Sequence, residues 1–232
     1  MKKIIALILV LIISSLSVLA IINGMTPGDR LGDKTKYEIG VKVEKGWNLL
    51  VAATPDLISQ DRIYGGGDIK KENIKMIYVF NPFIQQYARV FPNPEQEKIH
   101  KLVESFPQDS DLLANSAWVY SDKAGYLRFR PDEYLLDLED RKLVLGWNFV
   151  GITPEFTGKK FKEMTGNCII EKAYVYVYQD GTNPHWEKIV QEKDSLIPKE
   201  FEGMGMVVKV KGEPCSMGGM KTAENTVPSL PA

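Results

Sequence analysis

Two apolar runs that open with the same three residue types dominate the hydrophobic pattern of this chain. The motif reads Gly46, Trp47 and Asn48 in the first run and Gly146, Trp147 and Asn148 in the second. The first continues as Leu-Leu-Val and the second as Phe-Val-Gly-Ile. Short apolar runs bounded by turn residues are typical of buried β-strands. Both runs are therefore predicted to be strands, each starting at a glycine that permits a tight entry.

The similarity between the two halves continues beyond the motif. Three further segment pairs match, namely 78–81 with 176–179, 87–90 with 186–189, and 118–120 with 206–208. A period of about 100 residues is too long for a solenoid repeat. The pattern predicts two tandem β-rich modules, residues 37–130 and 131–211. The first module carries an insertion over 94–106.

Alternating and continuous apolar segments predict the remaining elements. Strands are expected at 37–43, 74–80, 85–91, 169–179, 186–190 and 206–211. Residues 95–106 have apolar positions at helical spacing, and residues 159–165 predict a second short helix or turn. Segments 118–121 and 126–130 predict a hairpin, because a Gly-containing turn separates them. The predicted fold class is mainly β (α+β), with two small modules and one or two short helices.

The repeated tryptophans are predicted to be core residues. An identical large aromatic side chain at the same place in both halves favours a role in the fold over a role in ligand binding. Replacing Trp47 or Trp147 with Ala would then cost about 3–5 kcal/mol of stability.

Other aromatic residues allow two interpretations. Tyr174, Tyr176 and Tyr178 are spaced by two, so a strand places them on one face. They can form the core of the second module. Alternatively, the outward-facing member of this row can form, with Tyr87 and Trp186, a ligand surface on which sugar rings stack.

The N-terminus resembles an export signal. Two lysines precede an apolar run from Ile4 to Ile22, and Val18-Leu19-Ala20 resembles a cleavage site. Residues 1–22 are therefore a cleaved signal peptide or an uncleaved membrane anchor, and either outcome predicts an extracytoplasmic location. Residues 23–36 are predicted to be a linker. Residues 212–232 are predicted to be a disordered tail.

The two cysteines, Cys168 and Cys215, fit a single disulfide in an exported chain. A bridge between them would close a long loop in the second module and stabilise it by about 4 kcal/mol. A free thiol pair or an intermolecular disulfide are the alternatives.

Charge and motifs exclude several classes of function. The formal net charge is −1, so a nucleic-acid partner has no electrostatic support. The only two histidines, His100 and His185, are far apart in sequence and belong to no zinc motif. No nucleophile elbow or phosphate-binding motif is found, so no catalytic residue, metal or cofactor is predicted.

The same segments carry a family resemblance over residues 37–210. The Gly-Trp-Asn strand, the Tyr-containing strand and the closing Ala117-Trp118-Val119 resemble repeats of envelope and S-layer-associated proteins of archaea and bacteria. In the second half, Gly205-Met206-Val207 lacks the closing aromatics. The resemblance implies a small β-rich surface module without catalytic residues.

Three functional hypotheses follow. The first is a non-enzymatic, exported cell-envelope protein with a structural, adhesive or protein-interaction role. The second is an extracellular carbohydrate-binding protein that uses Tyr87 and Trp186. The third is a hydrolase whose site is not recognisable in the sequence. The expected partner is an envelope protein or a glycan, with membrane attachment if the N-terminal segment is not cleaved.

Overall fold

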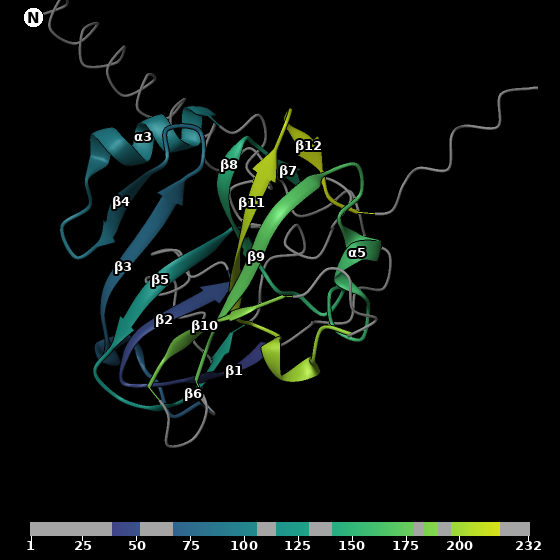
Figure 1. Ribbon diagram of the computed structural model, residues 1–232. Coiled ribbons are helices and arrows are strands. Elements are labelled where there is room, and N and C mark those ends of the chain that lie inside the picture. Colours follow the sequence, from purple (N-terminus) through teal and green to yellow (C-terminus); the bar gives the residue numbers. More distant parts are fainter. Residues whose placement is uncertain are drawn as a thin grey trace, which may run out of the picture. The chain divides into compact units, whose positions relative to one another are not determined.

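Two four-stranded antiparallel sheets and two short helices make up most of the described structure (Figure 1). The computed structural model describes residues 39–51, 67–105, 115–129, 141–178, 183–189 and 196–218. The predicted mainly-β fold class is confirmed. The predicted signal or anchor, the linker and the module boundary at 130–131 lie outside these residues.

The two sheets have the same strand order. The first sheet contains, from edge to edge, β2 (Gly46–Val51), β5 (Ser116–Ser121), β3 (Ile74–Asn81) and β4 (Gln86–Phe91). The second sheet contains, from edge to edge, β8 (Gly146–Gly151), β11 (Gly205–Lys211), β9 (Ile169–Val177) and β10 (His185–Lys188). In both sheets the strand that comes last in the chain lies between the first and the second.

Two smaller antiparallel pairs complete the strands. β1 (Ile39–Val43) pairs with β6 (Gly125–Phe129), and β7 (Lys142–Leu143) pairs with β12 (Cys215–Ser216). The predicted hairpin between 118–121 and 126–130 is therefore wrong. Because β2 and β3 already occupy both edges of β5, no edge of β5 is left for β6.

The helices lie in the segments that the sequence predicted. Helix α3 (Gln96–Ser105) occupies the predicted insertion and buries Leu102, while α5 (Phe161–Met164) is a single turn. Two 3-10 turns, η1 (Lys71–Asn73) and η3 (Lys199–Phe201), precede strands. None of the helices in the described part of the chain has the length and hydrophobicity needed to cross a bilayer.

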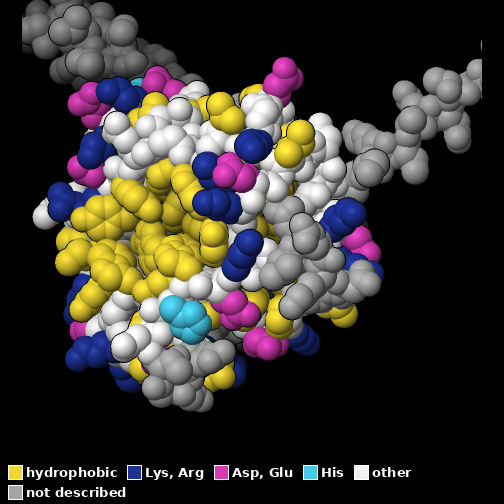
Figure 2. All heavy atoms as spheres, in the orientation of Figure 1, with side chains coloured by type: hydrophobic (Ala, Val, Ile, Leu, Met, Phe, Trp, Pro, Cys, Tyr) yellow, Lys and Arg dark blue, Asp and Glu magenta, His cyan; other side chains and the backbone are white. Residues whose placement is uncertain are grey.

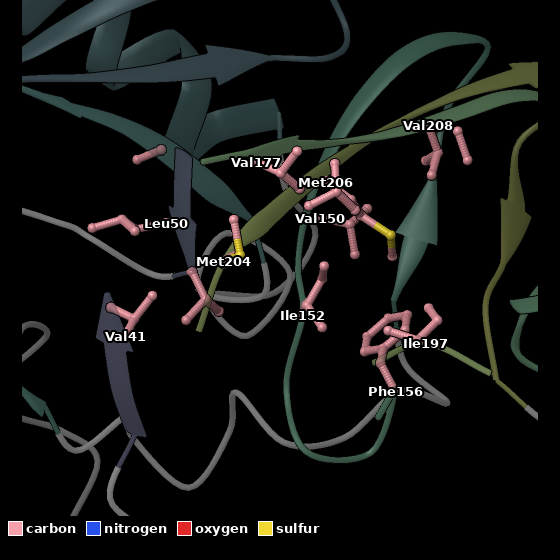
Figure 3. Close-up of a cluster of buried hydrophobic side chains, with 14 of the residues drawn as sticks. Val41, Leu50, Val150, Ile152, Phe156, Val177, Ile197, Met204, Met206 and Val208 are labelled. Atoms are coloured by element: carbon pink, nitrogen blue, oxygen red, sulfur yellow. The ribbon is translucent and has the colours of Figure 1, made fainter. Parts of the chain in front are cut away.

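One main core is shared by both sheets. Leu50 comes from the first sheet and Val150, Val177 and Met206 come from the second, and all belong to the same cluster of buried side chains (Figure 3). Buried side chains from both halves therefore pack into one core. The backbones approach closely at Gly151, where an added Cβ would lie 2.1 Å from the Val51 Cγ2 atom.

The motif tryptophans lie outside this core, so their predicted role as core residues is wrong. Trp47 is 37% exposed and Trp147 is partly buried. Strand alternation gives the reason, because Asn48 and Leu50 lie on the buried face of β2 while Trp47 lies on the opposite face.

The asparagine is the inward-facing member of the motif. The Glu44 backbone N–H donates to Asn48 Oδ1, and Asn48 Nδ2 donates to the Glu44 carbonyl, each at 2.9 Å. Asn148 makes the same two bonds to Val144, at 2.9 and 2.7 Å. Each asparagine therefore closes the turn that enters the strand. The intervening glycine has a positive φ in both copies, +115° at Gly46 and +92° at Gly146.

Strand register corrects the match between the two final strands. Trp118 lies opposite Leu49 in the first sheet, and Val207 lies opposite Phe149 in the second. The counterpart of Trp118 is therefore Val207, and the predicted match with Met206 is wrong by one residue. A shift of one residue exchanges the two faces of a strand, and Met206 is fully buried in the main core.

The match between β3 and β9 shifts by two residues. Tyr78 lies opposite Trp118, and Tyr174 lies opposite Val207. The counterpart of Tyr78 is therefore Tyr174 rather than the predicted Tyr176. Because a shift of two keeps a side chain on the same face, this error leaves the aromatic face of the strand unchanged.

The Cys168–Cys215 disulfide is present, as one of the sequence interpretations predicted, with a Cα–Cα distance of 5.1 Å. Both cysteines belong to the main core, and Met217 is also buried there. The expectation of a disordered tail from residue 212 is wrong for residues 212–218, because the disulfide and the β7–β12 pair attach this segment to the fold. Residues 219–232 lie outside the described part.

Candidate functional site

All four tryptophans of the chain belong to one connected group of aromatic rings. We call this group the aromatic surface; it consists of Trp47, Tyr78, Trp118, Tyr120, Trp147, Tyr174, Tyr176, Tyr178 and Trp186. Figure 2 shows a broad hydrophobic area on one face of the molecule, bordered by charged side chains. Every ring of the group is at least partly exposed.

Strand alternation places these rings on the face opposite to the main core. In β9, Ala173, Val175 and Val177 are buried in the core. Tyr174 and Tyr176 alternate with them and are only partly buried, which confirms that they share one face. The interpretation of this tyrosine row as the core of a second module is therefore wrong.

Trp118 joins the two sheets within the aromatic surface. It comes from β5 of the first sheet, and its ring lies 4.9 Å from Tyr176 and 5.8 Å from Trp186, centroid to centroid. Both partners belong to the second sheet. On the other side, Trp118 contacts Trp47 at 6.5 Å. Neither sheet alone therefore contains the complete surface.

A second group of rings lies beside the first and contains Tyr87. Phe80 of β3 stacks on Phe149 of β8 at 4.6 Å, and Tyr87 of β4 contacts both rings, at 5.1 and 5.8 Å. Leu49 and Val207 are buried with Phe80 and Phe149 in a small cluster. Trp118, Trp147, Tyr174 and Tyr176 pack against that cluster. Part of the aromatic surface therefore packs against buried apolar side chains of both sheets.

The two sequence-predicted ligand residues lie in these adjacent groups. Trp186 is 43% exposed and belongs to the aromatic surface, whereas Tyr87 is 45% exposed and belongs to the second group. The two residues occupy equivalent strand positions, because Tyr87 lies opposite Phe80 in the first sheet and Trp186 lies opposite Tyr176 in the second. The structure places both on the same side of their sheets as the other rings.

The backbone of each motif tryptophan is held by a side chain that lies next to a strand of the other sheet, because Gln85 precedes β4 and Tyr178 follows β9. The Gln85 side chain accepts from the Trp147 backbone N–H and donates to the Trp147 carbonyl, both at 3.0 Å. The Tyr178 hydroxyl donates to the Trp47 carbonyl. Burial raises the pKa of Tyr178, so this hydroxyl keeps its proton and remains a donor. These bonds fix the two sheets together at the aromatic surface.

Polar groups are distributed over the aromatic surface. The hydroxyls of Tyr78, Tyr120, Tyr174 and Tyr176, and the indole N–H groups of the four tryptophans, make no hydrogen bond to any other described residue. Burial raises the pKa of Tyr176, which therefore stays neutral. The surface is thus uncharged and apolar over its rings, with hydrogen-bonding groups available to a ligand.

Charged residues lie at the margin of the aromatic surface. Lys209 of β11 lies opposite Trp147 and forms an ion pair with Glu171 at 3.1 Å. The hydrogen bond from Lys209 lowers the pKa of Glu171. Lys188 lies opposite Tyr174. No ring of the surface carries a formal charge at neutral pH.

The residues considered for catalysis are not brought together. His100 pairs with Glu104 on exposed helix α3 at 3.2 Å, and His185 lies at the start of β10. Within the described ranges no group of three or more His, Cys, Asp or Glu residues could hold a metal ion. What the aromatic surface offers chemically is ring faces, hydroxyls and indole N–H groups, which bind ligands through contact and hydrogen bonds.

Sequence reasoning missed most of the aromatic surface. Trp47 and Trp147 were assigned to the core, and Tyr78, Trp118 and Tyr120 were not considered for binding. A usable signal exists, because aromatic residues in these strands alternate with aliphatic ones, as in Trp118-Val119-Tyr120 and Tyr174-Val175-Tyr176. Comparisons of this chain with protein-family models, with curated proteins and with solved structures found no match.

Proposed function

We propose that this chain is an exported, non-enzymatic binding protein of the cell envelope, and that the aromatic surface is its binding site. The observation that carries the proposal is the gathering of all four tryptophans in one partly exposed group of rings. Tryptophan and tyrosine are the residues that dominate binding energy at interfaces.

The exposure of these rings argues for a binding role. Trp47 and Trp186 leave 37% and 43% of their surface in water, although a large buried core is present in the same chain. Large contiguous apolar areas on soluble proteins mark sites that a partner or ligand covers. The hydrogen bonds of Gln85 and Tyr178 fix the backbone at Trp147 and Trp47 before binding. A preformed site loses less conformational entropy when a ligand binds.

Two observations support export. The N-terminal residues have the charge and hydrophobicity of a signal peptide or membrane anchor. The Cys168–Cys215 disulfide is typical of proteins that fold in an oxidising compartment. An envelope location also agrees with the resemblance to S-layer-associated repeats. A domain outside the membrane would present the aromatic surface to wall or surface components.

The internal symmetry supports a duplicated ancestor. Both sheets have the same strand order, and Asn48 and Asn148 make the same pair of hydrogen bonds. We infer that the two halves are tandem copies of one unit that came to share a core. The aromatic surface uses rings from both copies, so the duplication would have created a larger binding site than one copy provides.

The proposal is tested with envelope fractions of the producing cells. The mature protein is co-sedimented with this fraction, alongside the variants Trp186→Ala and Trp47→Ala. We expect each variant to lose affinity by about 10-fold or more, as for central interface aromatics. Tyr126→Ala is the matched control, because Tyr126 is 53% exposed and lies on β6, outside the aromatic surface. Equal sedimentation of the wild type and both tryptophan variants would contradict the proposal.

A further inference from the structure

We infer that the aromatic surface binds an uncharged polysaccharide, with the sugar chain lying across the boundary between the two sheets. This inference rests on the proposed function and names its ligand class. It is argued from the unpaired polar groups of the rings, from their geometry and from the small number of charged side chains beside them.

The polar groups of the rings select the chemistry of the ligand. The hydroxyls of Tyr78, Tyr120, Tyr174 and Tyr176 and the four indole N–H groups have no hydrogen-bond partner among the described residues. A polar group that is covered without a new hydrogen bond costs about 1–3 kcal/mol. An acyl chain or an aliphatic protein face would impose that cost at several positions. A polyol supplies donors and acceptors along its whole length and avoids the cost.

The geometry of the rings suits sugar stacking. Trp118 contacts Trp47, Tyr176 and Trp186 with interplanar angles of 83°, 80° and 83°. In such an edge-to-face pair one ring uses its edge, so this contact leaves both of its faces uncovered. The C–H groups on the faces of a pyranose form apolar patches, and these fit against an uncovered aromatic face.

Three indoles are linked by successive ring contacts across both sheets, and we call this series the row. Trp47 lies 6.5 Å from Trp118, and Trp118 lies 5.8 Å from Trp186. These steps are comparable with the length of one sugar unit. The two ends of the row are the exposed rings, and the middle ring is more buried. The row therefore fits a chain of consecutive sugars better than a single monosaccharide.

The charge distribution favours an uncharged glycan over an acidic one. The rings of the aromatic surface carry no formal charge, and three basic residues lie opposite them in the strands. Lys209 is paired with Glu171 and Arg89 donates to the Asn93 carbonyl, which leaves Lys188 opposite Tyr174. Recognition of a carboxylate or phosphate on each unit of a chain would call for several arginine or lysine groups without partners among the rings. The whole chain is also slightly acidic, with a formal net charge of −1.

The test uses immobilised polysaccharides with full-length mature protein. Neutral glucan, mannan and galactan are compared with polygalacturonate as the acidic probe, and binding is followed by tryptophan fluorescence because every tryptophan lies in the site. We expect binding to at least one neutral polymer, with a shift in emission. Trp186→Ala should weaken it by about 10-fold or more, while Tyr126→Ala leaves it unchanged. Binding to polygalacturonate alone would overturn the inference.

A second arm separates this inference from the proposed function. Envelope fractions are treated with periodate, which cleaves vicinal diols of sugars, or with protease. Loss of Trp186-dependent binding after periodate and not after protease supports a glycan. Loss after protease and not after periodate overturns the glycan inference but leaves an envelope-binding role in place. Binding that does not depend on Trp186 in any fraction overturns both.

Discussion

The two faces of the sheets are both hydrophobic, yet they differ in composition and in exposure. The shared face carries aliphatic side chains such as Leu50, Val150 and Met206, and these are almost completely buried. The opposite face carries tryptophan and tyrosine, and Trp47 and Trp186 remain exposed. Aliphatic residues therefore supply the packing that holds the fold together. Some of the aromatic residues also pack against the small cluster of Leu49, Phe80, Phe149 and Val207.

The largest expected effect is on the aliphatic face. Replacing Leu50 with Ala should lower the free energy of unfolding by about 2–5 kcal/mol, because it opens a cavity between the two sheets. Chemical denaturation followed by circular dichroism measures the loss. Leu145→Ala is the control, since Leu145 is 59% exposed, and it should change stability by less than about 0.5 kcal/mol. Equal effects of the two substitutions would contradict the role of Leu50 as a stabilising residue of the shared core.

The disulfide is also part of the aliphatic face. Replacing both Cys168 and Cys215 with Ser removes a bridge across 47 residues of sequence separation. We expect a loss of about 2–4 kcal/mol, since the unfolded chain gains conformational freedom. Thermal melts of the wild type and the double variant, both without reductant, measure the difference. If Tm is unchanged, the segment around β12 does not depend on the bridge for its attachment.

A smaller effect on stability is expected for the asparagine of the Gly-Trp-Asn motif, whose side chain lies on the aliphatic face. Asn48→Ala leaves the backbone N–H and carbonyl of Glu44 without their side-chain partner. The expected cost is about 1–3 kcal/mol. Asn148→Ala should cause a similar loss, because it breaks the equivalent bonds to Val144. Denaturation of the two variants side by side checks this, and strongly unequal losses would argue against equivalent roles.

The aromatic face should tolerate truncation at its exposed end. Trp186→Ala should lower stability by less than about 1 kcal/mol, because the ring is 43% exposed and lies on an edge strand. The same substitution should weaken ligand binding more than it weakens the fold. The same protein preparation serves for the thermal melt and the binding assay. A stability loss as great as that of Leu50→Ala would place Trp186 in the core and contradict the comparison.

The smallest effect concerns the ion pair at the margin of the aromatic face. The hydrogen bond from Lys209 holds the pKa of Glu171 below its ordinary value of 4.5. A lowered carboxyl pKa stabilises the fold above the ordinary value, and that contribution disappears as the pH falls through the lower value. Glu171→Gln should therefore reduce Tm slightly at pH 7 and not at pH 2–3. Binding of a neutral glycan should be the same for both proteins at pH 7.

Strand prediction succeeded where a segment has clear turn signals at both ends. β3, β4 and the helix α3 were predicted within a few residues, because Asn81-Pro82 and Pro94 mark their boundaries. Pairing was predicted less well. The segment 126–130 follows β5 closely in the chain but pairs with distant β1, and no local signal specifies that choice.

The binding site was predicted only in part. Tyr87 and Trp186 are predicted as ligand residues because a ladder of aromatic side chains can stack on sugars, whereas the repeat predicts Trp47 and Trp147 to be core residues. A strand that is hydrophobic on both faces gives no alternation of polar and apolar residues from which the buried face can be inferred. The same ambiguity explains the one-residue error that matched Trp118 with Met206 instead of Val207.

The sequence by itself determined the mainly-β class, most of the strand segments and the two cysteines available for a disulfide, because these depend on local composition and spacing. Only the tertiary structure decided that the halves share one core and which face of each strand enters it. That choice depends on the close approach of the sheets at Gly151 and Val51, a contact between residues far apart in the chain. The aromatic surface exists because the sheets meet there, and it was therefore not visible in either half alone.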